Sequence, residues 1–178
     1  MAAVLHKLPF FDEFTTVEVQ GSVHRVFPLQ IVVWVSLGPR GLRDLHPRTP
    51  RFPAVLDPAF TDTFLIHHEQ LRQFAGVRPE HLRQRSDSLR AHDRVIPLHA
   101  ANLWLHPNES GQRDRFANVS PFLMELHRGI GITTDADLYP RLPLLGARAL
   151  RGTNLQVLID YSRCQVFART PRRFWFFW

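Results

Sequence analysis

Cysteine is almost absent from this sequence, because Cys164 is the only one in 178 residues. A single cysteine cannot form an intrachain disulfide, so a disulfide-stapled secreted domain is excluded. Residues 1–11 lack the basic start and the apolar core of a signal peptide, and no apolar run approaches the ~20 residues of a membrane helix. We therefore expect a cytoplasmic protein with no membrane contact.

Lysine is also scarce, since Lys7 is the only one, and the formal net charge of +6 comes almost entirely from arginine. Guanidinium groups suit phosphates, so nucleic-acid binding is one interpretation of this composition. The arginines are spread along the whole chain, however, with no block beyond the pair at 172–173. A composition bias with ordinary solvated charge explains this pattern more simply, so we do not expect a nucleic-acid partner.

Motifs for a metal or a nucleotide cofactor are missing. The sequence has no cysteine pair, no glycine-rich phosphate loop and no Gly-x-Ser-x-Gly elbow. The two histidines and the glutamate at 67–69 are adjacent, and adjacent helix residues do not face the same way. A histidine recurs every seven residues, at His92, His99 and His106. In a strand this spacing places successive side chains on opposite faces. We therefore expect neither a metal site nor a cofactor.

Hydrophobic alternation and the 14 prolines together favour strands and irregular loops over long helices. The expected strands are residues 16–19, 30–35, 51–56, 63–66 and 95–105, with 86–93 as a polar loop. Residues 122–126 also alternate, although Ser120-Pro121 equally permits a helix start. Near the C-terminus, alternation over 155–159 and 164–168 predicts a hairpin. The sequence therefore predicts a mainly β fold.

Two short helices are expected within this β fold. Leu71, Phe74 and Ala75 follow helical spacing, and Gly76 can cap the end of that helix. A second helix is expected over residues 147–151, directly after an apolar segment. The predicted core consists of apolar residues from these strands and helices, namely Val33, Val35, Val55, Leu56, Phe64, Ile66, Leu71, Leu103, Leu144, Leu145, Leu150, Leu155, Val157 and Ile159.

Two motifs occur in an informative order. The first is an apolar strand that ends in Asp57-Pro58-Ala59 and is followed by another apolar strand and a helix. The second is Leu144-Leu145-Gly146, which opens a short helix before the final hairpin. This ordered pair resembles the retropepsin-like aspartic peptidases, including their bacterial cellular members. In that family an apolar strand ends in an Asp-Thr/Ser-Gly turn, and a later apolar-apolar-Gly motif precedes a helix. The resemblance covers roughly residues 30–170.

The resemblance implies a small, partly closed β-barrel with one or two short helices and Asp57 as the catalytic residue. The chemistry of the family needs two carboxylates that share a proton, one acting as base on a water and the other as acid towards the peptide. Each chain supplies one aspartate, so the site forms only in a homodimer, and the ligand is a peptide or protein. The resemblance also implies a flap within residues 92–111 and a structural Asp160.

The turn departs from the family pattern at two positions. Pro58 stands where the family has a Thr or Ser whose hydroxyl locks the two catalytic loops together, and proline has neither a hydroxyl nor an N–H. Ala59 replaces the glycine of the family, and its methyl group is expected to crowd a tight turn. Two functions therefore stay open: an aspartic endopeptidase, active or impaired, and a non-catalytic dimeric module that binds peptides or proteins.

The chain length favours a single domain that buries roughly 70% of its unfolded surface. We expect residues 1–29 to supply an N-terminal strand and lead-in, 30–170 the retropepsin-like domain, and 171–178 a C-terminal tail. Residues 174–178 are all aromatic. In an extended segment these side chains cannot all face one core, so we expect the tail to form a homodimer interface. The alternative is that the tail folds back and covers an open end of the barrel in its own chain.

Overall fold

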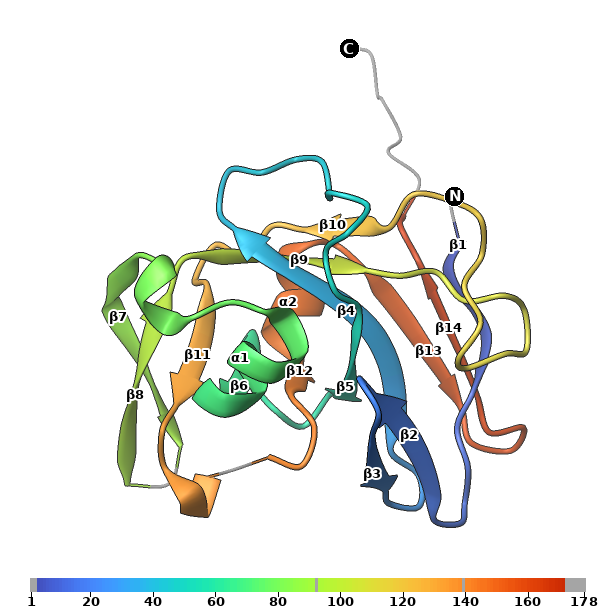
Figure 1. The fold of residues 1–178 in the computed structure, drawn as a ribbon. Coiled ribbons are helices and arrows are strands. Elements are labelled where there is room, and N and C mark those ends of the chain that lie inside the picture. Colours follow the sequence, from blue (N-terminus) through green and yellow to red (C-terminus); the bar gives the residue numbers. More distant parts are fainter. Residues whose placement is uncertain (1–2, 92, 139, 172–178) are drawn as a thin grey trace.

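The computed structural model describes residues 3–91, 93–138 and 140–171. Most of its strands form one large sheet (Figure 1). In chain order these strands are β4 (Ile31–Pro39), β5 (Phe52–Asp57), β6 (Phe64–His67), β7 (Gln84–Ala91), β8 (Arg94–His99), β9 (Ala101–Leu105), β10 (Phe122–Met124), β11 (Ile130–Thr133) and β12 (Leu144–Gly146). Their order across the sheet is β10-β9-β4-β5-β12-β6-β11-β8-β7. Among the described residues the sheet is open, ending at β10 and β7, so the expected closure into a barrel is not found.

The centre of this sheet contains two parallel pairs. Strand β12 runs parallel to β5 and antiparallel to β6, and β11 runs parallel to β6. Parallel neighbours need long connections, so each pair joins segments that are far apart in the chain. The two apolar motifs found in the sequence therefore meet in the middle of the sheet.

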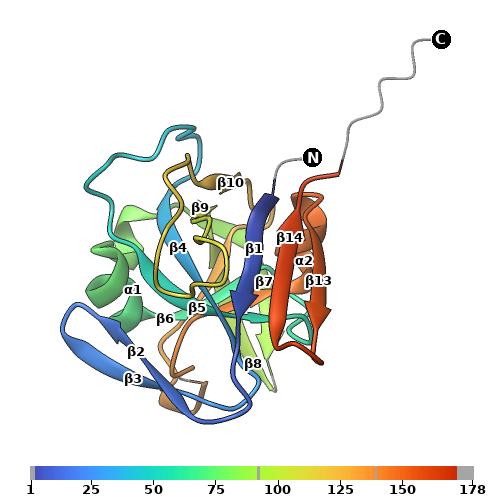
Figure 2. The ribbon, with the colours of Figure 1, turned by 90° about the vertical axis from the view of Figure 1, so that its right-hand side faces the viewer.

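A smaller three-stranded sheet lies beside the main one, with β14 (Gln165–Arg169) between β1 (Ala3–Pro9) and β13 (Gln156–Asp160) (Figure 2). The expected C-terminal hairpin is therefore confirmed, and β1 is a partner that periodicity did not indicate. Strands β2 (Thr15–Val19) and β3 (Ser22–Val26) form a separate hairpin. Leu5, Leu8 and Phe10 are buried in the same core as the main sheet, so residues 3–29 pack as part of the domain.

Both expected α-helices are present, as α1 (His68–Ala75) and α2 (Ala147–Gly152), and two 3-10 turns cover Pro79–His81 and Ala136–Leu138. Figure 1 shows α1 and α2 near the centre of the fold, next to β6 and β12. Helix α1 is capped at its N-terminus by His67, whose Nδ1 accepts from the Glu69 N–H at 3.3 Å. Its C-terminal cap is Gly76, whose φ of 67° is the left-handed conformation that glycine adopts without strain. In the described part of the chain, neither helix is long and apolar enough to cross a membrane.

The predicted core is largely confirmed. All its members are buried except Leu144, Val157 and Ile159, which are half-buried and pack against the core.

The largest difference between the expected and the observed elements is the polar segment at 86–93, which was expected to be a loop. It lies mostly in β7, an edge strand that buries Leu89 and exposes its charged residues to water. The strand expected over 95–105 is interrupted at Ala100, which separates β8 from β9.

Candidate functional site

Asp57 is the last residue of β5 and lies half-buried at the end of a central strand. Its Oδ1 accepts a hydrogen bond from the Ala59 N–H at 2.9 Å, and its backbone carbonyl accepts from the Phe60 N–H at 3.1 Å. Aspartate side chains commonly hold tight turns in this way. Within the described residues no arginine, lysine or histidine forms an ion pair with this carboxylate. The carboxylate is therefore oriented by its own turn.

Pro58 and Ala59 complete this turn and are both exposed. Ala59 is not among the described non-glycine residues with a positive φ, so the turn does not need a glycine at this position. Within a single chain the turn therefore accepts the methyl group of Ala59, and the expectation that it would crowd the turn is wrong. The N–H that glycine would supply is retained by Ala59 and is used by Asp57. Pro58 offers neither a hydroxyl nor an N–H to any neighbour.

The second motif lies directly beside Asp57. In the parallel pairing of β12 with β5, Leu144 lies opposite Val55 and Gly146 lies opposite Asp57. Leu145 is fully buried and belongs to the main core, which holds the strand in this register. The structure thus brings together all the residues that the sequence nominated for the site, although they come from opposite ends of the chain.

Gly146 allows the loop after Asp57 to pass directly over β12. The Gly146 N–H donates to the Thr63 carbonyl at 2.9 Å, and the Ala147 N–H donates to the Phe60 carbonyl, also at 2.9 Å. A Cβ atom on Gly146 would overlap the backbone oxygen of Asp62 and lie 2.5 Å from that of Phe60. Since these are backbone atoms, only glycine fits without displacing the loop. The motif therefore fixes the position of the whole 57–63 loop.

Asp62, in the same loop, was missed in the sequence. Its Oδ2 lies 3.0 Å from Nη1 of Arg128, and only 13% of its side chain is exposed. Its Oδ1 accepts from the Thr63 N–H at 2.8 Å. Because an arginine neutralises it, Asp62 is held as a structural carboxylate, whereas Asp57 has no such counter-ion among the described residues. Its position five residues after Asp57 was visible in the sequence, but the Arg128 partner was not.

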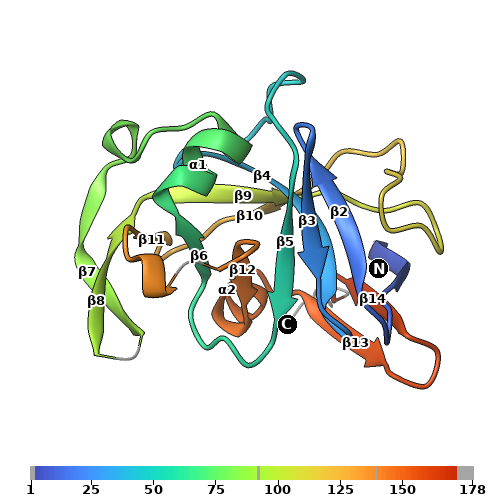
Figure 3. The ribbon, with the colours of Figure 1, turned by 60° about the horizontal axis from the view of Figure 1, so that its bottom comes forward.

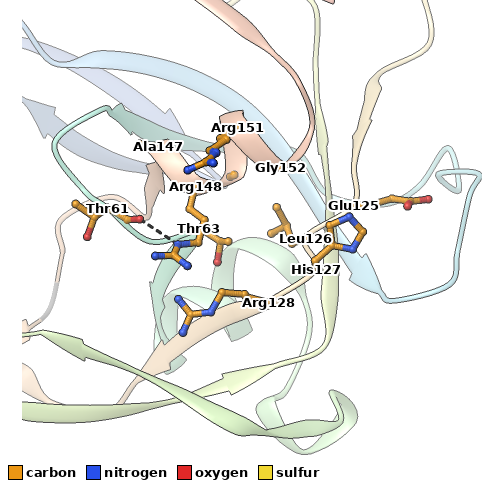
Figure 4. A pocket seen from close by; sticks show the side chains of 11 residues that line it. Thr61, Thr63, Glu125, Leu126, His127, Arg128, Ala147, Arg148, Arg151 and Gly152 are labelled. Carbon is orange, nitrogen blue, oxygen red and sulfur yellow. Dashed lines mark hydrogen bonds between the residues drawn. The ribbon is translucent and has the colours of Figure 1, made fainter.

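A cavity of about 680 Å³ lies behind the 57–63 loop, at the start of α2. Its walls come from the loop, from the segment before β11 and from α2 (Figure 4). We call it the arginine pocket, and its lining residues are Thr61, Thr63, Glu125, Leu126, His127, Arg128, Ala147, Arg148, Ala149, Arg151 and Gly152. Figure 4 shows the three guanidinium groups on one side of the pocket and the Glu125 carboxylate on the other. The sequence did not indicate this pocket.

The flap was expected within residues 92–111, and the hairpin formed by β7 and β8 overlaps the start of this range. The hairpin starts at Gln84, and residue 92 lies outside the described residues. Strand β9 also falls in the expected range, but it is completely buried inside the sheet and cannot act as a flap. In Figures 1 and 3 the end of the hairpin and the 57–63 loop lie on the same side of the molecule.

A buried Ser-His pair forms elsewhere in the sheet. Ser36 Oγ lies 2.9 Å from Nε2 of His106, and it donates its single proton to the Pro50 carbonyl at 2.8 Å. His106 must therefore donate to Ser36, which is the reverse of what activates a serine nucleophile. Burial, and then the nearby Arg51 charge, lower the His106 pKa to about 4. The pair is a structural hydrogen-bonded unit of the core.

In the described part of the chain no three His, Cys, Asp or Glu residues come close enough together to hold a metal ion. His67 is committed to capping α1, and its ring contacts that of His68. His99 is the last residue of β8, whereas His106 follows β9 and its ring is bonded to Ser36. Asp160 accepts from Ser162 Oγ at 2.6 Å, so it holds the turn of the final hairpin.

Comparisons with protein families, curated proteins and solved structures found no match for this chain. Its function therefore has to be argued from its own residues and geometry.

Proposed function

We propose that this protein is a retropepsin-like aspartic endopeptidase homologue, in which the Asp57 carboxylates of two chains face one water. The observation that carries the proposal is the position of Asp57. It is a half-buried carboxylate at the end of a central strand, oriented by its own turn and opposite Gly146 of the second motif. The order of strand, turn, strand, helix and later apolar-apolar-Gly strand supports the same proposal.

The proposed chemistry follows from placing two like charges together. Two carboxylates about 3 Å apart cannot both ionise, so the pair shares one proton. The ionised Asp57 takes a proton from water while the water oxygen attacks the peptide carbonyl carbon. The protonated Asp57 of the other chain gives its proton to the carbonyl oxygen. In the collapse of the resulting diol, the Asp57 that took the proton from water gives it to the nitrogen, the C–N bond breaks, and the other Asp57 takes back a proton from a diol hydroxyl.

Pro58 favours a second candidate, a dimeric module that binds peptides without cleaving them. A hydroxyl at this position is the group that would join the two loops across the dimer, and proline cannot supply it. Ala59, in contrast, keeps its N–H and fits its turn, so the defect is confined to one position. The two candidates share the fold and the dimer and differ only in whether the Asp57 pair is correctly aligned.

The test compares three forms of the protein on an unstructured protein substrate across the acidic range. Cleavage by the native chain should disappear in Asp57→Asn and increase in Pro58→Thr combined with Ala59→Gly, because the double variant restores the missing hydroxyl. Pepstatin-like transition-state mimics should bind the active forms. If neither the native chain nor the double variant cleaves while both are folded dimers, the endopeptidase proposal is wrong and the binding module remains.

A further inference from the structure

We propose that the arginine pocket binds a small molecule that carries a phosphate monoester on an apolar group. The site rests on different residues from the proposed Asp57 site, although both use the 57–63 loop. Its cationic end is formed by Arg128, Arg148 and Arg151, the first from the segment before β11 and the other two from α2. Planar guanidinium groups bind phosphate oxygens with paired N–H donors, better than a point charge does.

The charge balance of the pocket favours a dianion. Arg128 is already neutralised by Asp62 at 3.0 Å. Arg148 and Arg151 have no carboxylate partner among the residues that the structure describes. Glu125 also lines the pocket, but its carboxylate points away from the guanidinium groups (Figure 4). Two uncompensated cations match the roughly −1.5 to −2 charge of a phosphate monoester near neutral pH.

The geometry of the pocket holds one of these cations in place. Arg148 Nε donates to the Thr61 carbonyl at 3.4 Å, and the Arg148 N–H donates to the Asp62 carbonyl at 3.3 Å. These bonds leave the terminal Nη groups of Arg148 for a ligand. Arg151 is exposed in the last turn of α2 and can close over a bound anion. The hydroxyl groups of Thr61 and Thr63 lie in the wall beside them, although Thr63 is already bonded to the Gly129 carbonyl.

The remaining volume predicts an organic substituent on the phosphate. A cavity of about 680 Å³ is within the range of small-molecule sites, and a single phosphate would leave most of it empty. Half-buried Ala147 and exposed Gly152 line its wall together with the arginine side chains, whose stems are aliphatic. Apolar surface of this kind is best covered by an apolar or aromatic group. The inferred ligand is therefore amphipathic, with its phosphate at the arginine end.

Calorimetric titration with phenyl phosphate tests the proposal, with inorganic phosphate and phenol as the two separate halves of the probe. Phenyl phosphate should bind more tightly than either half. Arg148→Gln and Arg151→Gln should each weaken binding about tenfold, because each removes a charged hydrogen-bond donor. The Arg151 side chain makes no hydrogen bond or ion pair that the structure describes, and its backbone bond to the Asn154 N–H does not depend on the side chain, so its replacement carries little risk to folding. Arg90→Gln, an exposed arginine of β7 outside the pocket, should leave binding unchanged.

Two further variants make the test sharper. Asp62→Asn should tighten binding, because it removes the charge that neutralises Arg128 and keeps an oxygen to accept from Thr63. Asp57→Asn should leave binding unchanged, so a failed peptidase assay and a failed binding assay are distinguishable. The proposal is overturned if phenyl phosphate does not bind at millimolar concentration, or if Arg90→Gln weakens binding as much as Arg151→Gln. Equal affinity for phenyl phosphate and inorganic phosphate would overturn the inferred organic substituent.

Discussion

Gly146 lies opposite Asp57 in the parallel pairing of β12 with β5, and the loop after Asp57 crosses directly over Gly146. Two backbone hydrogen bonds, from Gly146 to Thr63 and from Ala147 to Phe60, tie the loop down. The loop that follows Asp57 is therefore held in place by a residue that has no side chain. Any change at Gly146 reaches the candidate site through the backbone.

Gly146→Ala should lower the free energy of unfolding by at least 1–3 kcal/mol, the usual cost of overpacking a tight core. The added methyl group would displace the carbonyl groups of Asp62 and Phe60, which are backbone and cannot rotate away. Urea unfolding is the measurement. Gly152→Ala is the control, because no atom lies within 4 Å of a Cβ placed there. Equal stability of the two variants would show that the loop is not held over Gly146.

Asp57→Asn should change stability by less than about 0.5 kcal/mol, while Asp57→Ala should cost about 1 kcal/mol. Asparagine keeps the oxygen that accepts from the Ala59 N–H at 2.9 Å, and alanine loses it. Thermal or urea unfolding of both variants separates the turn-forming role of Asp57 from its proposed chemistry. A large loss of stability in Asp57→Asn would mean that the charge itself stabilises the folded chain.

The stability of the protein should fall as the pH drops from about 6.5 to about 4. The pKa of His106 is lowered from 6.5 to about 4 by burial and by Arg51, so in this range the unfolded chain binds a proton that the folded chain excludes. Above 6.5 both states are neutral at this residue, and below 4 both are charged. The contribution of His106 to this loss is on the order of 3 kcal/mol. Burial also lowers the pKa of His24, His67 and His99, which acts in the same direction.

His106→Gln should flatten the pH dependence of unfolding, because glutamine can donate to Ser36 without titrating. His81→Gln, at an exposed position, should leave the slope unchanged. Parallel slopes for His106→Gln and the native chain would show that His106 is not the group responsible. The same loss of stability sets an acid limit for any Asp57-dependent cleavage, so activity and unfolding must be measured at the same pH values.

The full-length chain should have the mass of a homodimer in solution, and deletion of residues 174–178 should halve it. These aromatic residues lie outside the described residues, so the prediction rests on their sequence and on the need of the proposed site for two copies of Asp57. Sedimentation or light scattering at high micromolar concentration is the measurement. A clean monomer under those conditions rules out both the dimer and a shared Asp57 pair there.

Local features of the fold were predictable from the sequence. Apolar runs located β4 and β5, helical spacing before Gly76 located α1, and the two motifs marked the ends of β5 and β12. Strand β1 and the Asp62–Arg128 ion pair were not predictable, because each depends on a partner from a distant part of the chain. The β7 segment was misjudged because an edge strand exposes most of its side chains, so its polarity resembled that of a loop.

The sheet order β5-β12-β6 also has a consequence for how the chain folds. Strands β5 and β6 are neighbours in the sequence, yet β12 separates them in space. A nascent chain that ends before Leu144 leaves this central position empty, with the unpaired edges of two apolar strands exposed. Contacts between such distant segments form slowly, because a long loop must close first. We therefore expect that N-terminal fragments cannot complete the main sheet and that folding waits for the C-terminal third of the chain.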